Sequence, residues 1–164
     1  MLTLTRKTDY ALIALTHLVR EPDGCSSARE IAARYHVPLS LLMNVLKLLK
    51  KRGLARSVRG PRGGYMLAKP PRQITLSNII QAVEGQIHLV RCVARQENKA
   101  SGAGKHTCEL MSACPVRSSV HRVHHRLVQF LDEVTLADVA ENPAASHDDR
   151  AACQTSEVAE SEEF

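Results

Sequence analysis

The stretch from residue 27 to residue 68 constrains the fold more than any other part of the chain, because two helical patterns are followed directly by a hairpin pattern. Ser27 and Glu30 fit a capping box that opens a short helix. A second helix, capped by Ser40, runs to about Lys51 and buries one apolar stripe, made of Leu42, Val45, Leu46 and Leu49. A short helix, a turn and a second helix predict a helix-turn-helix, whose second helix enters the DNA major groove.

A hairpin pattern follows this pair of helices. Residues 54–58 and 65–68 are typical of short strands, and the linking sequence RGPRGG favours a tight turn through Pro61 and its paired glycines. The hairpin is interpreted as a wing, whose tip carries Arg59 and Arg62 toward phosphates or a minor groove. The loop lacks the Lys-Ser or Lys-Thr ending and the following helix of a nucleotide-binding P-loop, which excludes that alternative.

Basic residues gather in the same region. Residues 1–75 carry fourteen Lys and Arg against four Asp and Glu, and nine basic residues with no acidic one lie between Lys47 and Arg72. Such a patch is typical of a nucleic-acid footprint, although a solvated surface alone would also explain it. The helix and wing pattern favours double-stranded DNA. The expected contacts are Ser40, Met43, Asn44, Lys47, Lys51, Ser57, Arg59 and Arg62.

The N-terminal part predicts a buried helix and no export signal. Thr8 is interpreted as the N-cap of this helix, with Asp9 in its first turn. Asp9 and His17 interrupt the apolar run, no small-residue cleavage site follows, and no run is long enough to span a bilayer. We therefore expect a cytoplasmic protein without a membrane partner. Five cysteines in such a chain favour reduced thiols, used for metal binding or redox sensing, over a disulfide framework.

The C-terminal half predicts a dimerisation helix. Apolar residues alternate spacings of four and three, as in a coiled coil: Val116, Val120, Val123, Leu127, Phe130 and Val134. The histidines at 121, 124 and 125 are interpreted as outer-face or rim residues. The fold class is therefore mainly α, a winged helix-turn-helix with a long C-terminal dimerisation helix. A homodimer of such units reads a pseudo-palindromic DNA operator.

Three regions are expected along the chain. Residues 1–84 form the winged helix-turn-helix, residues 85–142 hold a cysteine-containing loop and the dimerisation helix, and residues 143–164 form an acidic tail. The tail carries six acidic residues against one Arg and is nearly free of large apolar side chains, a composition typical of disorder.

Several segments in the same order resemble a known family. The sequences TRKTDYALIALTHL, VRGPRGGYMLAKP, IIQAVEG, CELMSACPVR and FLDEVTLADV are similar to segments of bacterial winged-helix regulators that sense iron-sulfur clusters, the family of IscR and NsrR. The resemblance covers about residues 1–142 and is greatest to the regulators of SUF cluster-assembly operons. It implies a homodimeric transcriptional regulator, not an enzyme, whose operator affinity is controlled by a 2Fe-2S or 4Fe-4S cluster and which regulates cluster-assembly genes.

The resemblance also implies the cluster ligands. Cys92, Cys108 and Cys114 match the three cysteines that hold the cluster in the family. Three thiolates leave one position for a weaker ligand, which suits a sensor. Cys114 directly precedes Pro115, so it is expected near a helix N-terminus, where a thiolate is stabilised.

The fourth ligand is expected to differ from that of IscR. Arg117 stands three residues after the last of these cysteines, where IscR-like members offer a histidine, and it cannot ligate iron. Asp9 matches the acid that NsrR-like members contribute from the first helix of the partner subunit, with His106 in reserve. The other reading of Asp9 is a simple first-turn charge.

Other functions of the same thiols stay open. A regulator of the same family could respond to nitric oxide, to iron or to redox state, and one without a cluster could use thiol oxidation. Zinc would need three cysteines and His106, yet the chain has no C-x2-C pair. A thiol enzyme would need a nucleophile motif that the chain lacks. Cys25 and Cys153 are interpreted as incidental.

Overall fold

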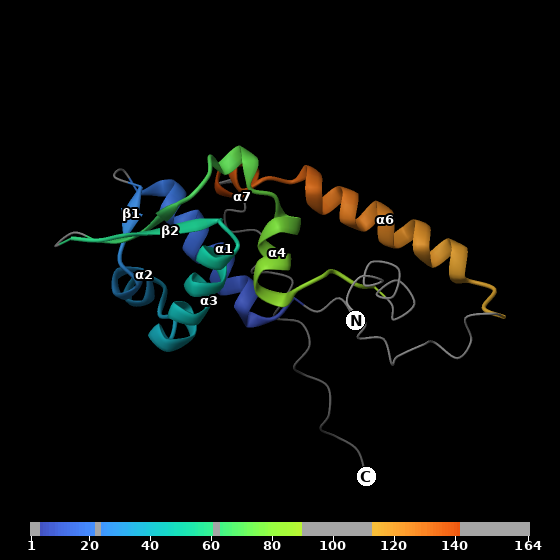
Figure 1. Ribbon diagram of the computed structural model, residues 1–164, viewed down its shortest axis with the longest axis horizontal. Helices are drawn as coiled ribbons and strands as arrows, with labels where there is room; N and C mark the ends of the chain where they lie inside the picture. The colour runs from blue at the N-terminus through green and yellow to red at the C-terminus, as the bar shows by residue number, and fades with distance from the viewer. Residues whose placement is uncertain (1–3, 22–23, 61–62, 90–112, 142–164) are drawn as a thin grey trace, which may run out of the picture.

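The computed structural model describes residues 4–21, 24–60, 63–89 and 113–141 (Figure 1). Six α-helices run through these residues: α1 (Arg6–Arg20), α2 (Ala28–Tyr35), α3 (Leu39–Lys51), α4 (Leu76–Glu84), α6 (Arg117–Glu133) and α7 (Leu136–Glu141). A small antiparallel sheet and a 3-10 turn, η1 (Pro71–Gln73), complete the described part. The expectation of a mainly α, winged helix-turn-helix fold is confirmed.

Helices α2 and α3 form the helix-turn-helix. The capping box of α2 is present, because the Ser27 hydroxyl accepts from the Glu30 N–H and the Glu30 carboxylate accepts from the Ser27 N–H. α2 ends at Tyr35, and its C-cap His36 has a left-handed backbone (φ 53°) that turns the chain toward α3. The prediction that Ser40 caps α3 is wrong. Pro38 is the N-cap, and its carbonyl accepts hydrogen bonds from the N–H groups of Leu41 and Leu42.

The wing is a three-stranded sheet of order β1-β3-β2. Strands β2 (Ala55–Val58) and β3 (Gly64–Leu67) form the predicted hairpin. The two-residue strand β1 (Cys25–Ser26) pairs with β3 and was not predicted. A Cβ on Gly64 would lie 2.4 Å from the Ser26 carbonyl oxygen, so glycine is what lets β1 approach β3.

Helix α1 crosses the centre of the domain. Its N-cap is Thr5, whose hydroxyl accepts from the Lys7 N–H, and not Thr8 as predicted. Thr8 lies inside the helix and is fully buried, and its hydroxyl donates to Glu84 Oε1 at 3.0 Å. Side chains of α1 pack in one core with side chains of α2, α3 and α4. The buried residues of this core include Ala11, Leu15, Ile31, Leu42, Leu46 and Ile79.

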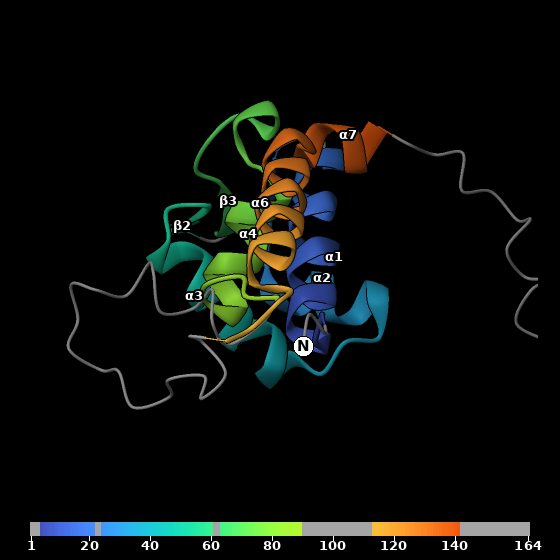
Figure 2. The same cartoon turned by 90° about the vertical axis from the view of Figure 1, so that its right-hand side faces the viewer.

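Helix α6 packs on α4 and extends away from the other helices, as Figure 1 shows on the right. Figure 2 looks along α6 from its far end, with α1 and α4 behind it. After α6 the chain returns to the core: the Val134 carbonyl accepts from the Leu76 N–H, and the Leu136 N–H donates to the Ile74 carbonyl. Leu136 is fully buried, and α7 packs on α1 and η1. No described helix is long and apolar enough to cross a membrane.

Candidate nucleic-acid interface and metal ligands

The exposed face of α3 carries the predicted contacts of the second helix. The four residues of its apolar stripe are buried in the core, as predicted. Ser40, Asn44, Lys47 and Lys51 are exposed on the opposite side. Met43 is also exposed, on the flank of α3 that it shares with Lys50. The helix therefore presents amide, hydroxyl, thioether and ammonium groups along one surface.

The wing is attached to α3 by a side-chain contact. Lys50 Nζ donates to Ser57 Oγ at 2.9 Å, which joins the last turn of α3 to β2. Arg59 is exposed at the end of β2, and Arg62 lies outside the described residues. Lys50 was not among the predicted contacts. Its spacing of three from Lys47 placed it beside that face, but the sequence could not show that it reaches the wing.

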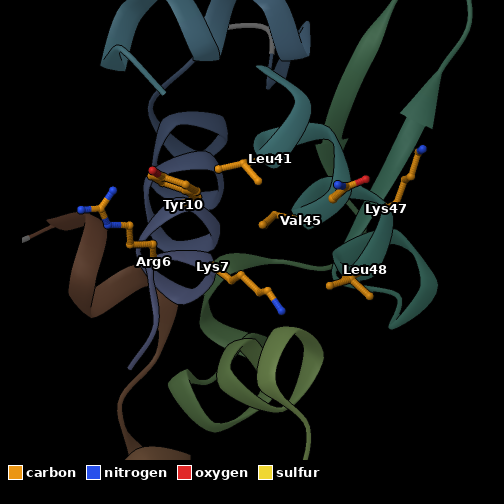
Figure 3. A pocket seen from close by; sticks show the side chains of 8 residues that line it. Arg6, Lys7, Tyr10, Leu41, Val45, Lys47 and Leu48 are labelled. Atoms are coloured by element: carbon orange, nitrogen blue, oxygen red, sulfur yellow. The ribbon is translucent and has the colours of Figure 1, made fainter. Parts of the chain in front are cut away.

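A groove lies between the start of α1 and the exposed side of α3. Its volume is about 460 Å³, and it is lined by Arg6, Lys7, Tyr10, Leu41, Asn44, Val45, Lys47 and Leu48. In Figure 3, Tyr10 of α1 faces Leu41 of α3, and Lys7 extends from α1 toward Leu48. The floor is apolar and the cations come from both helices. Arg6 and Lys7 were not assigned a function from the sequence, where they are an unremarked basic pair before a helix.

Two of the four predicted metal ligands belong to the described residues. Cys92 and Cys108 lie outside them, as does the reserve ligand His106. Cys114 is half-buried two residues before Val116, the N-cap of α6, as its position before Pro115 suggested. Asp9 is exposed on the first turn of α1. Within the described ranges, no group of three or more His, Cys, Asp and Glu side chains could hold a metal.

The first turn of α1 is attached to the end of α4. Glu84 Oε1 accepts hydrogen bonds from the hydroxyls of both Thr5 and Thr8. The same turn carries Asp9, and Glu84 stands eight residues before Cys92 in the sequence. The helix that offers the candidate fourth ligand is therefore fixed to the helix that leads toward the cysteines.

The α6 histidines do not all lie where the sequence predicted. His125 is exposed, but His124 is only 6% exposed, so its assignment to the outer face or rim is wrong. His124 stands seven residues before the buried Leu131, which places both on the face of α6 that packs on α4. The predicted coiled-coil positions instead leave Val116, Val123 and Phe130 more than half exposed (55%, 56% and 58%).

A buried histidine lies outside both predicted sites. His17 of α1 has its Nδ1 3.3 Å from the Tyr35 hydroxyl and its Nε2 3.3 Å from Glu21 Oε1. Burial lowers the pKa of His17 below its ordinary value, and Arg34 lowers it further, whereas Glu21 and Glu30 act in the opposite direction. Arg34 also pairs with Glu21, at 3.3 Å.

Comparisons with known proteins agree with this arrangement. Residues 4–142 match the model of the Rrf2 family, described as iron-dependent transcriptional regulators. An HTH-type transcriptional regulator of Haemophilus influenzae is 38% identical over 137 residues, which is 83% of this chain and 85% of that one.

Solved structures align with most of the chain. CymR, titled the global cysteine regulator of B. subtilis, is similar with a TM-score of 0.65 and 27% identity, covering 86% of this chain and 98% of that one. T. potens IscR is similar with a TM-score of 0.61 and 28% identity, covering 86% and 88%. These relatives are named as regulators and not as enzymes, and the predicted resemblance is confirmed. The chain belongs to the Rrf2 family of iron-dependent transcriptional regulators.

Proposed function

We propose that this regulator is a cytoplasmic homodimer that binds a double-stranded DNA operator, with an affinity controlled by an iron-sulfur cluster. The observation that carries the proposal is the polar and basic face of α3, which lies beside a wing that is hydrogen-bonded to the same helix. A rigid pair of contact elements of this kind suits recognition of a groove and the phosphates beside it. The target genes would be those of iron-sulfur cluster assembly.

Each exposed side chain suits one part of a duplex. The Asn44 amide can donate and accept at one adenine edge in the major groove, and the Met43 thioether can contact a thymine methyl. Lys47 and Lys51 supply charge for phosphates, which fixes the position of α3 without reading sequence. Arg59, at the wing, can enter a minor groove, whose potential attracts a guanidinium group.

The proposed cluster ligands are Cys92, Cys108 and Cys114 of one subunit and Asp9 of the partner subunit. Three thiolates and one carboxylate are a donor set that iron accepts, and the half-buried Cys114 and exposed Asp9 are both open to a ligand. A bound cluster would link the two subunits, and oxygen, iron supply or nitric oxide would act by breaking or restoring that link. Asp9 is held on a turn that Glu84 fixes to α4.

Control of DNA affinity then requires two dimer geometries. Ligands from two subunits stabilise the geometry in which Asp9 of one α1 faces the cysteines of the other. Arg6 and Lys7 are on the same turn as Asp9 and line the groove beside α3. Coupling of this kind changes affinity by about 5- to 150-fold in typical proteins.

A second candidate keeps the same DNA surface but uses the three thiols without iron. It is favoured by the likeness to CymR, because one similar solved structure is the oxidized form of Staphylococcus aureus CymR (TM-score 0.62, 27% identity). CymR of B. subtilis aligns with this chain at least as well as T. potens IscR does (TM-scores of 0.65 and 0.61). In this candidate, oxidation of the thiols in place of cluster gain or loss would change the geometry.

The experiment is metal analysis combined with DNA binding. Protein purified without oxygen is assayed for iron, zinc and acid-labile sulfide, beside a variant with Cys92, Cys108 and Cys114 changed to Ala. Both are titrated with a duplex selected from a random-sequence library. We expect iron and sulfide in matching amounts in the parent only, and a parent affinity that changes when the metal is removed.

The outcomes separate the two candidates. Parent protein that binds the duplex but contains no sulfide would reject the cluster, and a disulfide formed by mild oxidation would then support the thiol candidate. Parent protein that selects no duplex from the library, with or without metal, would reject DNA binding itself.

A further inference from the structure

The groove between α1 and α3 combines apolar and basic side chains, of which DNA phosphates would contact only the basic ones. Its floor is made of Tyr10, Leu41, Val45 and Leu48, while its charged side chains are Arg6, Lys7 and Lys47. None of the eight lining residues is acidic. Leu41 is 47% exposed, which leaves an apolar side chain uncovered beside cations. Such a surface fits a segment that combines carboxylates with large apolar side chains.

The region after α7 contains one segment of this composition. Residues 156–164, SEVAESEEF, carry four glutamates and no basic residue, together with Val158 and Phe164. The rest of the region after α7 differs: residues 143–155 carry two aspartates, one Arg and no large apolar side chain. Charge and apolar content therefore both single out residues 156–164 as complementary to the groove.

The covalent connection allows this segment to reach the groove. Arg20 Nη2 at the end of α1 donates to the Ala140 carbonyl at 3.1 Å, so the chain leaves α7 near that end. The groove lies at the other end of α1, and a 15-residue helix is about 22 Å long. The fifteen residues from 142 to 156 span up to about 50 Å when extended, more than twice that length.

We propose that residues 156–164 dock in the α1–α3 groove and compete with DNA for it. Asn44 and Lys47 line the groove and are also proposed DNA contacts, so an occupant covers part of the recognition surface. The inference rests on the proposed function for its consequence, since competition matters only if DNA binds there, but the docking itself does not require DNA. The segment acts as an autoinhibitory contact that raises the threshold for DNA binding.

The expected size of the effect follows from tethering. A linked segment has an effective concentration on the order of 1 mM, and a weak charged contact has a dissociation constant on the order of 100 µM. The groove is then about tenfold less available than in the absence of the segment. Salt weakens contacts between exposed charges, so the inhibition is expected to shrink as ionic strength rises.

The first test detects docking without DNA. Carbodiimide treatment of the full-length protein joins a lysine amine to a carboxylate only where the two are in contact, and mass spectrometry locates the links. We expect links from Lys7 or Lys47 to Glu157, Glu160, Glu162 or Glu163. Lys69, exposed beyond β3, is the matched lysine and should give none. Absence of links to Lys7 and Lys47, or equal links to Lys69, overturns the proposal.

The second test measures the consequence for DNA. The full-length variant with the four glutamates changed to Gln is compared with a variant carrying Asp148→Asn and Asp149→Asn, which alters acids of the same region outside the segment. On a 30-base-pair duplex at low salt, we expect about tenfold tighter binding from the first variant only. If both variants bind DNA equally more tightly, general repulsion between acidic residues and DNA explains the effect, and the proposal is overturned. No DNA binding by any variant, with the cross-links present, would reject the proposed function and leave the docking intact.

Discussion

His17 shows how one residue can make the stability of this fold depend on pH. The imidazole is almost fully buried between Tyr35 and Glu21, and burial lowers its pKa below the ordinary value of 6.5. The folded protein therefore binds fewer protons than the unfolded chain at any pH between the lowered pKa and 6.5. The stability that neutral His17 contributes is present above pH 6.5 and falls as the pH is lowered through that window.

This predicts a specific difference between His17→Gln and the parent. The free energy of unfolding from urea titrations at about pH 7.5 and about pH 5.5 should fall more in the parent than in the variant, because the variant has no group to protonate there. Glu21 moderates the parent's fall, since its charge favours the imidazolium. His125→Gln, on the exposed side of α6, should keep the parent's pH dependence. Identical pH dependence in all three proteins would mean that His17 is not protonated on unfolding.

At the scale of elements, helix caps decide where the helices of the helix-turn-helix begin. Ser27 closes a capping box on α2, and two hydrogen bonds from the Ser27 backbone and side chain lower the pKa of Glu30. Ser40 has the same side chain but lies inside α3, after its N-cap Pro38. Serine stabilises a helix as an N-cap and is a weaker helix former than alanine inside one.

Ser27→Ala should therefore lower the free energy of unfolding by about 1 kcal/mol. Ser40→Ala, made as the matched control, should leave it unchanged or raise it slightly. Urea unfolding followed by far-ultraviolet circular dichroism measures both. If Ser40→Ala costs as much as Ser27→Ala, Ser40 acts as the N-cap of α3, and the helix begins at Leu41, two residues later than Leu39.

Periodicity predicted the elements well, and tertiary contacts explain what it missed. The stripe of α3 and the two strands of the wing followed from apolar spacing and turn residues, and both are present. Strand β1 has only two residues, too few for an alternating pattern, and exists because Gly64 lets it approach β3. Thr8 resembles a cap in sequence, but its hydroxyl is used by Glu84, seventy-six residues away. Contacts at that separation leave no local pattern.

The candidate sites were predicted less completely than the fold. The exposed residues of α3 and the wing could be predicted from the sequence, because helical periodicity and the position of the turn indicate which side chains face outward. Arg6 and Lys7 could not, since only the packing of α1 against α3 makes them part of a groove. The predicted metal ligands Cys92 and Cys108 lie outside the described residues, so the ligand set stays a prediction.

At the scale of the whole molecule, α6 has two apolar faces, and within the described residues only one of them packs on another helix. One face, with His124 and Leu131, packs toward α4. The other presents Val116, Val123 and Phe130 to solvent, each more than half exposed, at the spacing of seven that a coiled-coil seam requires. Exposed apolar residues in such a row are typical of an interface. A second copy of α6 would cover them by symmetry.

Changing both Val123 and Phe130 to Asp should therefore convert a dimer into a monomer, because two buried carboxylates facing their copies would cost more than the seam contributes. Sedimentation velocity measures the change in mass, and circular dichroism checks that the fold survives, as expected for positions outside the core. His125→Asp adds a carboxylate to the opposite, exposed side of α6 and should stay dimeric. A monomeric variant holds only one half-site, so its affinity for a palindromic duplex should fall on the order of 100-fold. A variant that stays dimeric would place the dimer interface elsewhere, and a folded parent that is monomeric would remove the symmetry on which a two-half-site operator depends.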